Sequence, residues 1–151
     1  MIRKTTKTRR DHRRRGIRGR GMSVLETALV LPFLLALVLG MVEFGWALFV
    51  SHTLQGAARV GARAGIVAGG TDADILQSVG NTMSASGFQT SDYTVTITKA
   101  NGAATSATTA DPGDEIMVRV KVDWDKAKPG FSLYSAALNQ LSAQTVMRKE
   151  G

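Results

Sequence analysis

An apolar run at residues 22–50 constrains the fold of this 151-residue chain more than any other feature. The run contains only two charged residues, Glu26 and Glu43, with sixteen uncharged and mostly apolar residues between them. As an α-helix, residues 27–50 would rise about 36 Å at about 1.5 Å per residue, enough to cross a hydrocarbon core of about 30 Å. A buried core helix is the alternative, but so short a chain has little sequence left to surround that surface. The run therefore predicts a transmembrane helix.

The distribution of charge predicts how this helix is oriented. Residues 1–21 hold ten of the 19 Lys and Arg residues and one acid, whereas the rest of the chain holds nine basic and eleven acidic residues. The formal net charge of +7 therefore comes from the amino-terminal tail. Positive charge favours the cytoplasmic side, so the carboxyl-terminal part is expected to cross the membrane. The same tail would bind nucleic-acid phosphates nonspecifically if it persisted. The topology signal already accounts for the charge, so no specific nucleic-acid partner is expected.

The residue types present exclude several kinds of chemistry. The chain has no cysteine, which excludes disulfides, thiol catalysis and thiolate metal sites, and only two histidines that lie far apart. Ser51 and His52 are adjacent but have no acidic residue nearby in the sequence. Asp111, Asp114 and Glu115 form an acidic turn whose spacing matches no calcium loop. We therefore predict no enzymatic activity, no cofactor, no metal and no small-molecule substrate.

The junction between the basic tail and the apolar run carries a specific signal. A secretory signal peptide has a shorter apolar core, of about 7–15 residues, with its cleavage site after it. An uncleaved anchor is also compatible with the run. The residues RGRG (18–21) followed by MSVLE (22–26) instead resemble the class III signal of type IV pilins and pseudopilins. The resemblance implies cleavage by prepilin peptidase between Gly21 and Met22, which makes Glu26 the fifth mature residue; Met22 replaces the Phe that is common there.

Three further segments narrow the resemblance to the TadE-like pseudopilins (minor pilins) of the tight-adherence (Tad or Flp) pilus. They are SVLETALVLPF (23–33), GMVEFG (40–45) and AARVGARAG (57–65). The resemblance implies a structural, single-pass protein of the bacterial cytoplasmic (inner) membrane. Its implied partners are prepilin peptidase, other pilins or pseudopilins of the Tad system, the inner-membrane platform and membrane lipid. Whether such a protein enters the pilus shaft, the tip or only the membrane is left open.

Both carboxylates of the apolar run need an explanation, because a charge in a membrane helix costs on the order of 2–3 kcal/mol unless it finds a partner. Glu26 is expected in the first helical turn, where the helix dipole favours it. It could pair with the new amino terminus of a neighbouring subunit and so fix helix register, or it could be solvated at headgroup level. Glu43 either faces another subunit or lies at the outer headgroup boundary beside Trp46. Pro32 is expected to kink the helix.

Small residues recur every four positions after the apolar run, at Ala57, Gly61, Gly65 and Gly69. Such a ridge permits close helix packing. It either contacts the helix of another pilin or packs against the chain's own carboxyl-terminal domain, and the second alternative is favoured.

The remaining sequence predicts a small α+β domain. Residues 71–74 (TDAD) begin a helix, and alternating residues 93–98 and 116–124 read as strands. A short helix is expected within 131–138 and a weaker strand at 141–148. The predicted organisation is a leader (1–21), a transmembrane helix (22–50), a helix extension (51–70) and an extracytoplasmic α+β head with a short antiparallel sheet (71–151), typical of a pilin.

Overall fold

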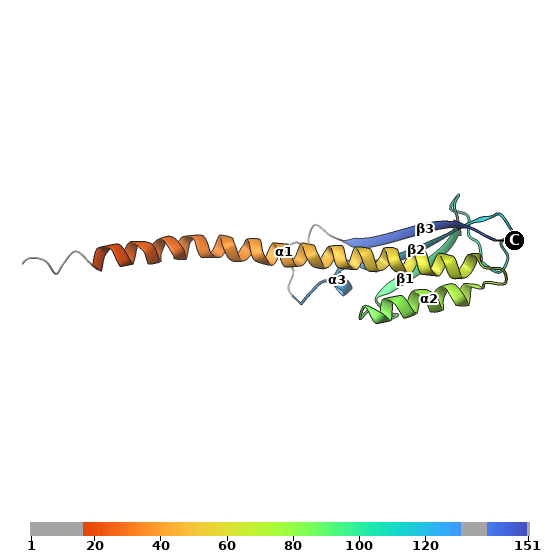
Figure 1. Cartoon of the computed structure of the whole chain (residues 1–151), viewed down its shortest axis with the longest axis horizontal. Coiled ribbons are helices and arrows are strands. Elements are labelled where there is room, and N and C mark those ends of the chain that lie inside the picture. The colour runs from red at the N-terminus through yellow and green to blue at the C-terminus, as the bar shows by residue number, and fades with distance from the viewer. Residues whose placement is uncertain (1–16, 131–138, 151) are drawn as a thin grey trace, which may run out of the picture. The chain divides into compact units, whose positions relative to one another are not determined.

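The computed structural model describes residues 17–130 and 139–150 and divides into two compact units, Met1–Leu39 and Gly40–Gly151. Helix α1, Ile17–Ile66, has 50 residues, beginning in the first unit and ending in the second (Figure 1). The two units are described separately below, and Gly40–Gly151 is called the C-terminal unit.

The described part of the first unit is helical, and every side chain from residue 22 to residue 39 is exposed. Leu and Ala, which favour helix, make up much of this segment. A helix also satisfies its own backbone hydrogen bonds, so it suits a segment that has no sheet partner. Pro32 lies inside α1, and the helix continues past it.

The C-terminal unit contains a three-stranded antiparallel sheet in the order β1-β2-β3. Strand β1 is Tyr93–Lys99, β2 is Glu115–Asp123 and β3 is Gln140–Arg148. In this register the central residue Val120 pairs with Val95 on one side and Ala143 on the other. The long apolar helix followed by a small antiparallel sheet confirms the predicted α+β class.

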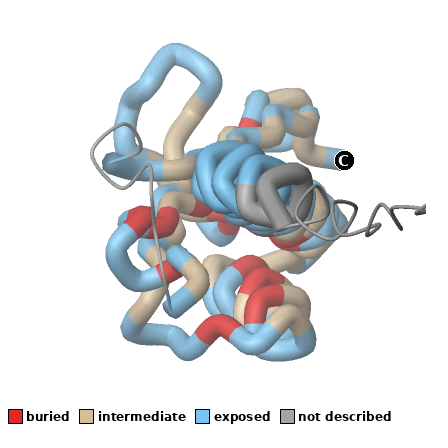
Figure 2. Tube along the Cα trace, turned by 90° about the vertical axis from the view of Figure 1, so that its left-hand side faces the viewer, coloured by how far each residue is buried: buried red, intermediate tan, exposed pale blue. Residues whose placement is uncertain are grey.

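One face of the sheet packs against the second half of α1 and against α2, Asp72–Ala85 (Figure 2). β2 alternates strictly, with its even-numbered residues buried and the others at least partly exposed, as its sequence predicted. The shared core contains buried side chains from both helices and the central strand: Val50, Leu54, Ala57, Ala58, Ala62, Ile75, Val79, Met83, Ile116, Val118, Val120 and Val122.

Helix α2 begins where its sequence predicted. The Thr71 hydroxyl accepts a hydrogen bond from the Asp74 amide at 3.3 Å, and the Asp74 carboxylate accepts one from the Thr71 amide at 2.9 Å. These two bonds form a capping box. The pKa of Asp74 is lowered, because its carboxylate accepts a hydrogen bond from the Thr71 hydroxyl at 2.7 Å, the larger cause, and one from the Thr71 amide. At the other end Gly87 adopts a φ of 89°, which glycine tolerates without strain.

Two boundaries differ from expectation. Strand β2 ends at Asp123 and not at 124, and Trp124, whose side chain is buried, begins a short helix, α3 (Trp124–Ala127). Helix α1 ends at Ile66, so Gly69 lies in the following turn, with a φ of 80°, and is not part of the small-residue ridge. The short helix expected within 131–138 lies outside the described residues.

Candidate membrane anchor and assembly surface

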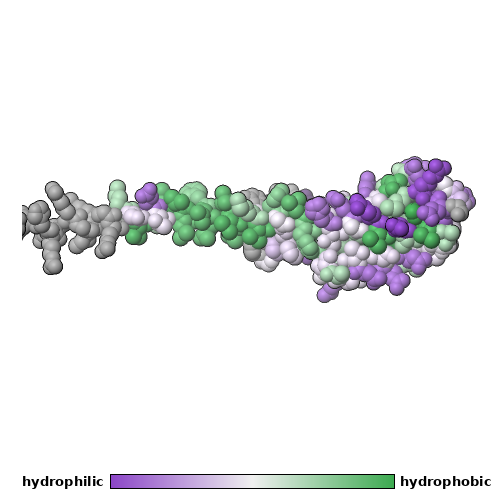
Figure 3. All heavy atoms as spheres, in the orientation of Figure 1, coloured by the Kyte–Doolittle hydropathy of each residue, from purple (hydrophilic) through white to green (hydrophobic). Residues whose placement is uncertain are grey.

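Helix α1 is long and apolar enough to cross a membrane over Met22–Ile66, and none of its most apolar window is buried. Figure 3 shows the apolar side chains gathered along the first part of this helix, whereas hydrophilic side chains are spread over the C-terminal unit. Length and composition carry this assignment. The large apolar residues from 22 to 39 expose between 37% and 74% of their surface to solvent, which is unusual for a water-soluble domain.

The predicted cleavage position lies within α1, because the helix begins at Ile17 and continues through Gly21 and Met22. Glu26 is therefore not in the first turn of the helix in the full chain, contrary to expectation. It would be near the helix start only in a chain that begins at Met22. The favourable dipole at Glu26 is thus conditional on cleavage.

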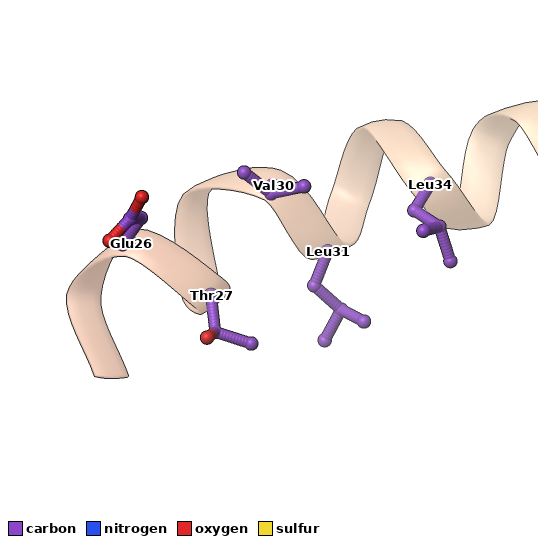
Figure 4. A pocket seen from close by; sticks show the side chains of 5 residues that line it. All are labelled: Glu26, Thr27, Val30, Leu31 and Leu34. Carbon is purple, nitrogen blue, oxygen red and sulfur yellow. The ribbon is translucent and has the colours of Figure 1, made fainter. Parts of the chain in front are cut away.

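Glu26 stands on an exposed, apolar helix surface. A shallow hollow beside it is lined by Thr27, Val30, Leu31 and Leu34 (Figure 4). The Thr27 hydroxyl is satisfied locally, donating to the Ser23 carbonyl at 2.9 Å. The Glu26 carboxylate makes no hydrogen bond or ion pair with the residues that the structure describes. The site thus offers an accessible carboxylate with apolar neighbours on one helix.

Glu43 occupies a different environment, because its side chain is only 1% exposed. It lies in the C-terminal unit, one helical turn before Ala47 and two before Val50, which pack on the core. The chain itself covers this carboxylate, which neither interpretation of its sequence position had considered. A helical spacing of three and four residues could have suggested that Glu43 faces the core. One side of a helix is shared by residues 43, 47, 50, 54, 57 and 58.

Trp46 links α1 to α3. Its indole N–H donates to the carbonyl of Ala127, and its ring lies 5.3 Å from that of Phe49, tilted by 37°. Trp46 nevertheless keeps 38% of its surface exposed. The sequence placed Trp46 near a membrane boundary but gave no sign of its bond to α3.

The small residues of α1 face α2 of the same chain. A methyl group added to Gly61 would lie 2.6 Å from Cγ2 of Val79, and one added to Gly65 would lie 2.5 Å from Cδ1 of Ile75. Ala57 is fully buried on the same side. The structure therefore has the intrachain packing that was the favoured alternative for this ridge.

The acidic turn before β2 is held by hydrogen bonds within the chain. The Asp114 carboxylate accepts from Nζ of Lys99 at 2.8 Å and from the Asp111 amide at 3.1 Å. These donors lower the pKa of Asp114, with the Lys99 bond as the larger cause, and the same bond raises the pKa of Lys99. Asp72 instead accepts from the Ala107 amide at 2.6 Å. Among the residues that the structure describes, no group of three or more His, Cys, Asp or Glu side chains could hold a metal ion.

Sequence reasoning missed how the carboxyl end is attached. The Glu150 amide donates to the Ile66 carbonyl at 2.9 Å, at the end of α1. The Lys149 side chain donates to the Ala107 carbonyl, and Arg148 Nε donates to the Gly113 carbonyl at 3.1 Å. The last residue of β3, Arg148, and the next residue, Lys149, thus attach this end of the strand to two loops, a role that no local sequence pattern signals.

Residues 21–63 match the model of a known family, described as TadE-like protein. The match starts at Gly21 and runs through the exposed part of α1 into its buried part. The match confirms, over these residues, the resemblance found in the sequence. No curated protein and no solved structure is significantly similar to the chain.

Proposed function

From the TadE-like match over residues 21–63, we propose that this protein is a pseudopilin of the Tad pilus assembly system, cleaved by prepilin peptidase after Gly21. The single observation that carries the proposal is the offset between Gly21 and Glu26 in front of an exposed apolar helix. That offset makes Glu26 the fifth residue of the cleaved chain. The combination of a basic leader, a glycine and a carboxylate at this spacing indicates prepilin peptidase cleavage far more specifically than any of the three features alone.

Cleavage at this position requires the helix to open locally. A peptide bond inside an α-helix has its carbonyl engaged by the amide four residues later, which keeps it from an attacking nucleophile. Glycine costs about 1 kcal/mol relative to alanine in a helix. Gly21 therefore lowers the cost of unwinding at the Gly21–Met22 bond.

After cleavage, Glu26 would register one subunit against the next. The amino group of Met22 becomes a cation, and the exposed Glu26 carboxylate of a neighbouring subunit is the anion that would pair with it. A pair in low-dielectric surroundings is far stronger than one in water. A head-to-tail contact of this kind does not close on itself, so it suits a filament.

The ten basic residues of the leader support a topology with the amino end in the cytoplasm and the C-terminal unit outside. In this arrangement α1 anchors the protein in the inner membrane as a single pass. Its partners would be prepilin peptidase, other Tad pilins or pseudopilins, and the inner-membrane platform.

The decisive experiment is the intact mass and amino-terminal sequence of the protein isolated from membranes of its native host. A chain beginning at Met22 supports the proposal. The Gly21→Ala variant should then accumulate as the full-length precursor, whereas the matched Gly19→Ala variant should be processed normally. Equal processing of both variants would contradict cleavage after Gly21.

The registration role of Glu26 is tested separately. The Glu26→Ala variant should still be cleaved but should lose most surface pili, while Thr27→Ala, altered at the neighbouring position, should assemble them normally. Wild-type piliation in Glu26→Ala would remove the registration role and leave the cleavage proposal intact.

A second candidate is an uncleaved single-pass anchor that displays the C-terminal unit as a binding module. The observation in its favour is that α1 runs without interruption through the Gly21–Met22 bond. A mature chain that begins at Met1 or Ile2 would establish this alternative.

A further inference from the structure

We propose that α1 leaves the hydrocarbon core of the membrane at Val42, and that a collar of Phe44, Trp46, Leu48 and Phe49 lies in the phospholipid headgroup region. This inference rests on the proposed membrane anchor but not on cleavage or on pilus assembly. It replaces the sequence-based boundary at residue 50 with one about two helical turns earlier.

Along α1 from residue 22 onward, Glu43 is the first residue that the rest of the chain buries. Glu43 and Val50 are buried and Ala47 is half-buried, so one side of the helix already contacts protein at this level. The indole of Trp46 binds the Ala127 carbonyl, which brings α3 to the same level. Asp125, Lys126 and Lys128, in and directly after α3, are exposed and charged. Charged side chains are costly in hydrocarbon, so this level lies outside it.

The helix from residue 22 to residue 42 is long enough to cross the hydrocarbon core. Residues 22–42 rise about 31 Å at about 1.5 Å per residue, which already matches a hydrocarbon core of about 30 Å. All of these residues are exposed except Gly40, which is partly covered. The membrane span is therefore complete before the chain reaches Glu43, and residues 43–50 are not needed to cross the bilayer.

Aromatic and apolar side chains remain exposed on α1 beyond the membrane span. On the side of α1 away from the hydrophobic core, 67% of Phe44, 45% of Leu48 and 44% of Phe49 are exposed. The exposed positions that follow are more polar, beginning with His52 and Gln55. The collar is thus an aromatic and apolar surface continuous with the anchor on one side and with a polar helix face on the other. Trp is enriched at this depth because its ring is amphipathic and the headgroup region accepts both apolar and polar groups, which fits Trp46.

The depth of Trp46 tests the proposal directly, because the chain has only two tryptophans and the other, Trp124, is 1% exposed. The full-length Trp124→Phe variant, which retains Trp46, is reconstituted in phosphatidylcholine–phosphatidylglycerol vesicles. Bromine atoms are placed on the lipid acyl chains either near the glycerol or near the methyl end. We expect quenching of Trp46 to be about twofold stronger with the shallow bromines, as for a residue at the interface. The matched Trp46→Phe variant, which retains buried Trp124, should be quenched by neither.

Each other result overturns the proposal in a distinguishable way. Stronger quenching by the deep bromines would place Trp46 inside the hydrocarbon and restore the boundary at residue 50. A chain that floats with the vesicles but shows no quenching, or shows it only at low protein density, would assign the collar to a protein contact such as a second copy. A chain that does not float would overturn the membrane anchor and the collar together.

Because Trp124 is a core residue, a second measurement leaves it in place. The chain contains no cysteine, so single-cysteine variants can carry a spin label without background. Labels at Leu35→Cys and Gln55→Cys serve as references for the hydrocarbon and for water. A label at Phe49→Cys should be accessible to both dissolved oxygen and a water-soluble nickel reagent, at values between the two references. Oxygen and nickel accessibilities equal to those at Leu35→Cys would overturn the collar.

Discussion

The two parts of α1 show that hydropathy and burial are separate properties of one continuous helix. From residue 22 to residue 39 the helix carries large apolar side chains and buries none of them. From residue 50 to the end of the helix at Ile66, much smaller side chains, including Ala57, Ala58 and Ala62, are fully buried. The first part is suited to a solvent of lipid, in which large apolar groups need no protein cover. The second is suited to a close protein neighbour, because small side chains let α2 approach.

The largest expected difference between the two parts comes from the same substitution made in each. Leu54 is fully buried and Leu35 is half exposed. We expect Leu54→Ala to lower the free energy of unfolding of the C-terminal unit by about 2–5 kcal/mol, because it leaves a cavity. Leu35→Ala should leave that free energy unchanged. Denaturant unfolding of the detergent-solubilised full chain, followed by tryptophan fluorescence, measures both. Equal losses would show that the first part of α1 also packs against protein.

An intermediate effect is expected from adding one methyl group. Gly61→Ala should destabilise the C-terminal unit by about 1–3 kcal/mol, since the new Cβ meets Val79 of α2 at 2.6 Å. The matched Gly56→Ala change lies on the same helix with nothing within 4 Å of the new Cβ. It should instead stabilise the helix by about 0.5–1 kcal/mol, because alanine favours helix. Thermal unfolding followed by circular dichroism separates the two signs, and stabilisation by both would mean that α2 is not held against Gly61.

The smallest effect is a pH dependence confined to the C-terminal unit. Because Lys99 and the Asp111 amide lower the pKa of Asp114, its carboxylate stabilises the fold above the ordinary Asp pKa. That contribution is lost as pH falls through the lowered value. Asp114→Asn should therefore be slightly less stable than wild type at neutral pH and equally stable in strong acid. A difference in unfolding midpoint that stays constant across this pH range would contradict the role of the Asp114 carboxylate. The control is Asp125→Asn, which alters a more exposed ion pair.

Most of the local structure was predictable because it follows from local rules. The alternation of β2, the Thr71 and Asp74 cap of α2 and the glycine that ends it need only neighbouring residues. The position of the candidate cleavage site was also readable, since it depends on the spacing between Gly21 and Glu26. The start of α1 was not predictable. The helix begins at Ile17, in a leader that is rich in glycine and in charged residues.

What the sequence alone determined was the class of the protein: a basic amino-terminal tail, an apolar helix and a small α+β unit, with the signature that residues 21–63 share with the TadE-like family model. Only the tertiary structure decided at which residue the rest of the chain begins to bury one side of α1. Glu43 looks in the sequence like a second membrane carboxylate, yet it is covered by the chain itself. Hydropathy measures whether a residue favours water or an apolar solvent, whereas burial depends on which distant segment of the chain packs against that residue. In this chain α2, α3 and the sheet reach α1 from Glu43 onward, and no local pattern encodes that.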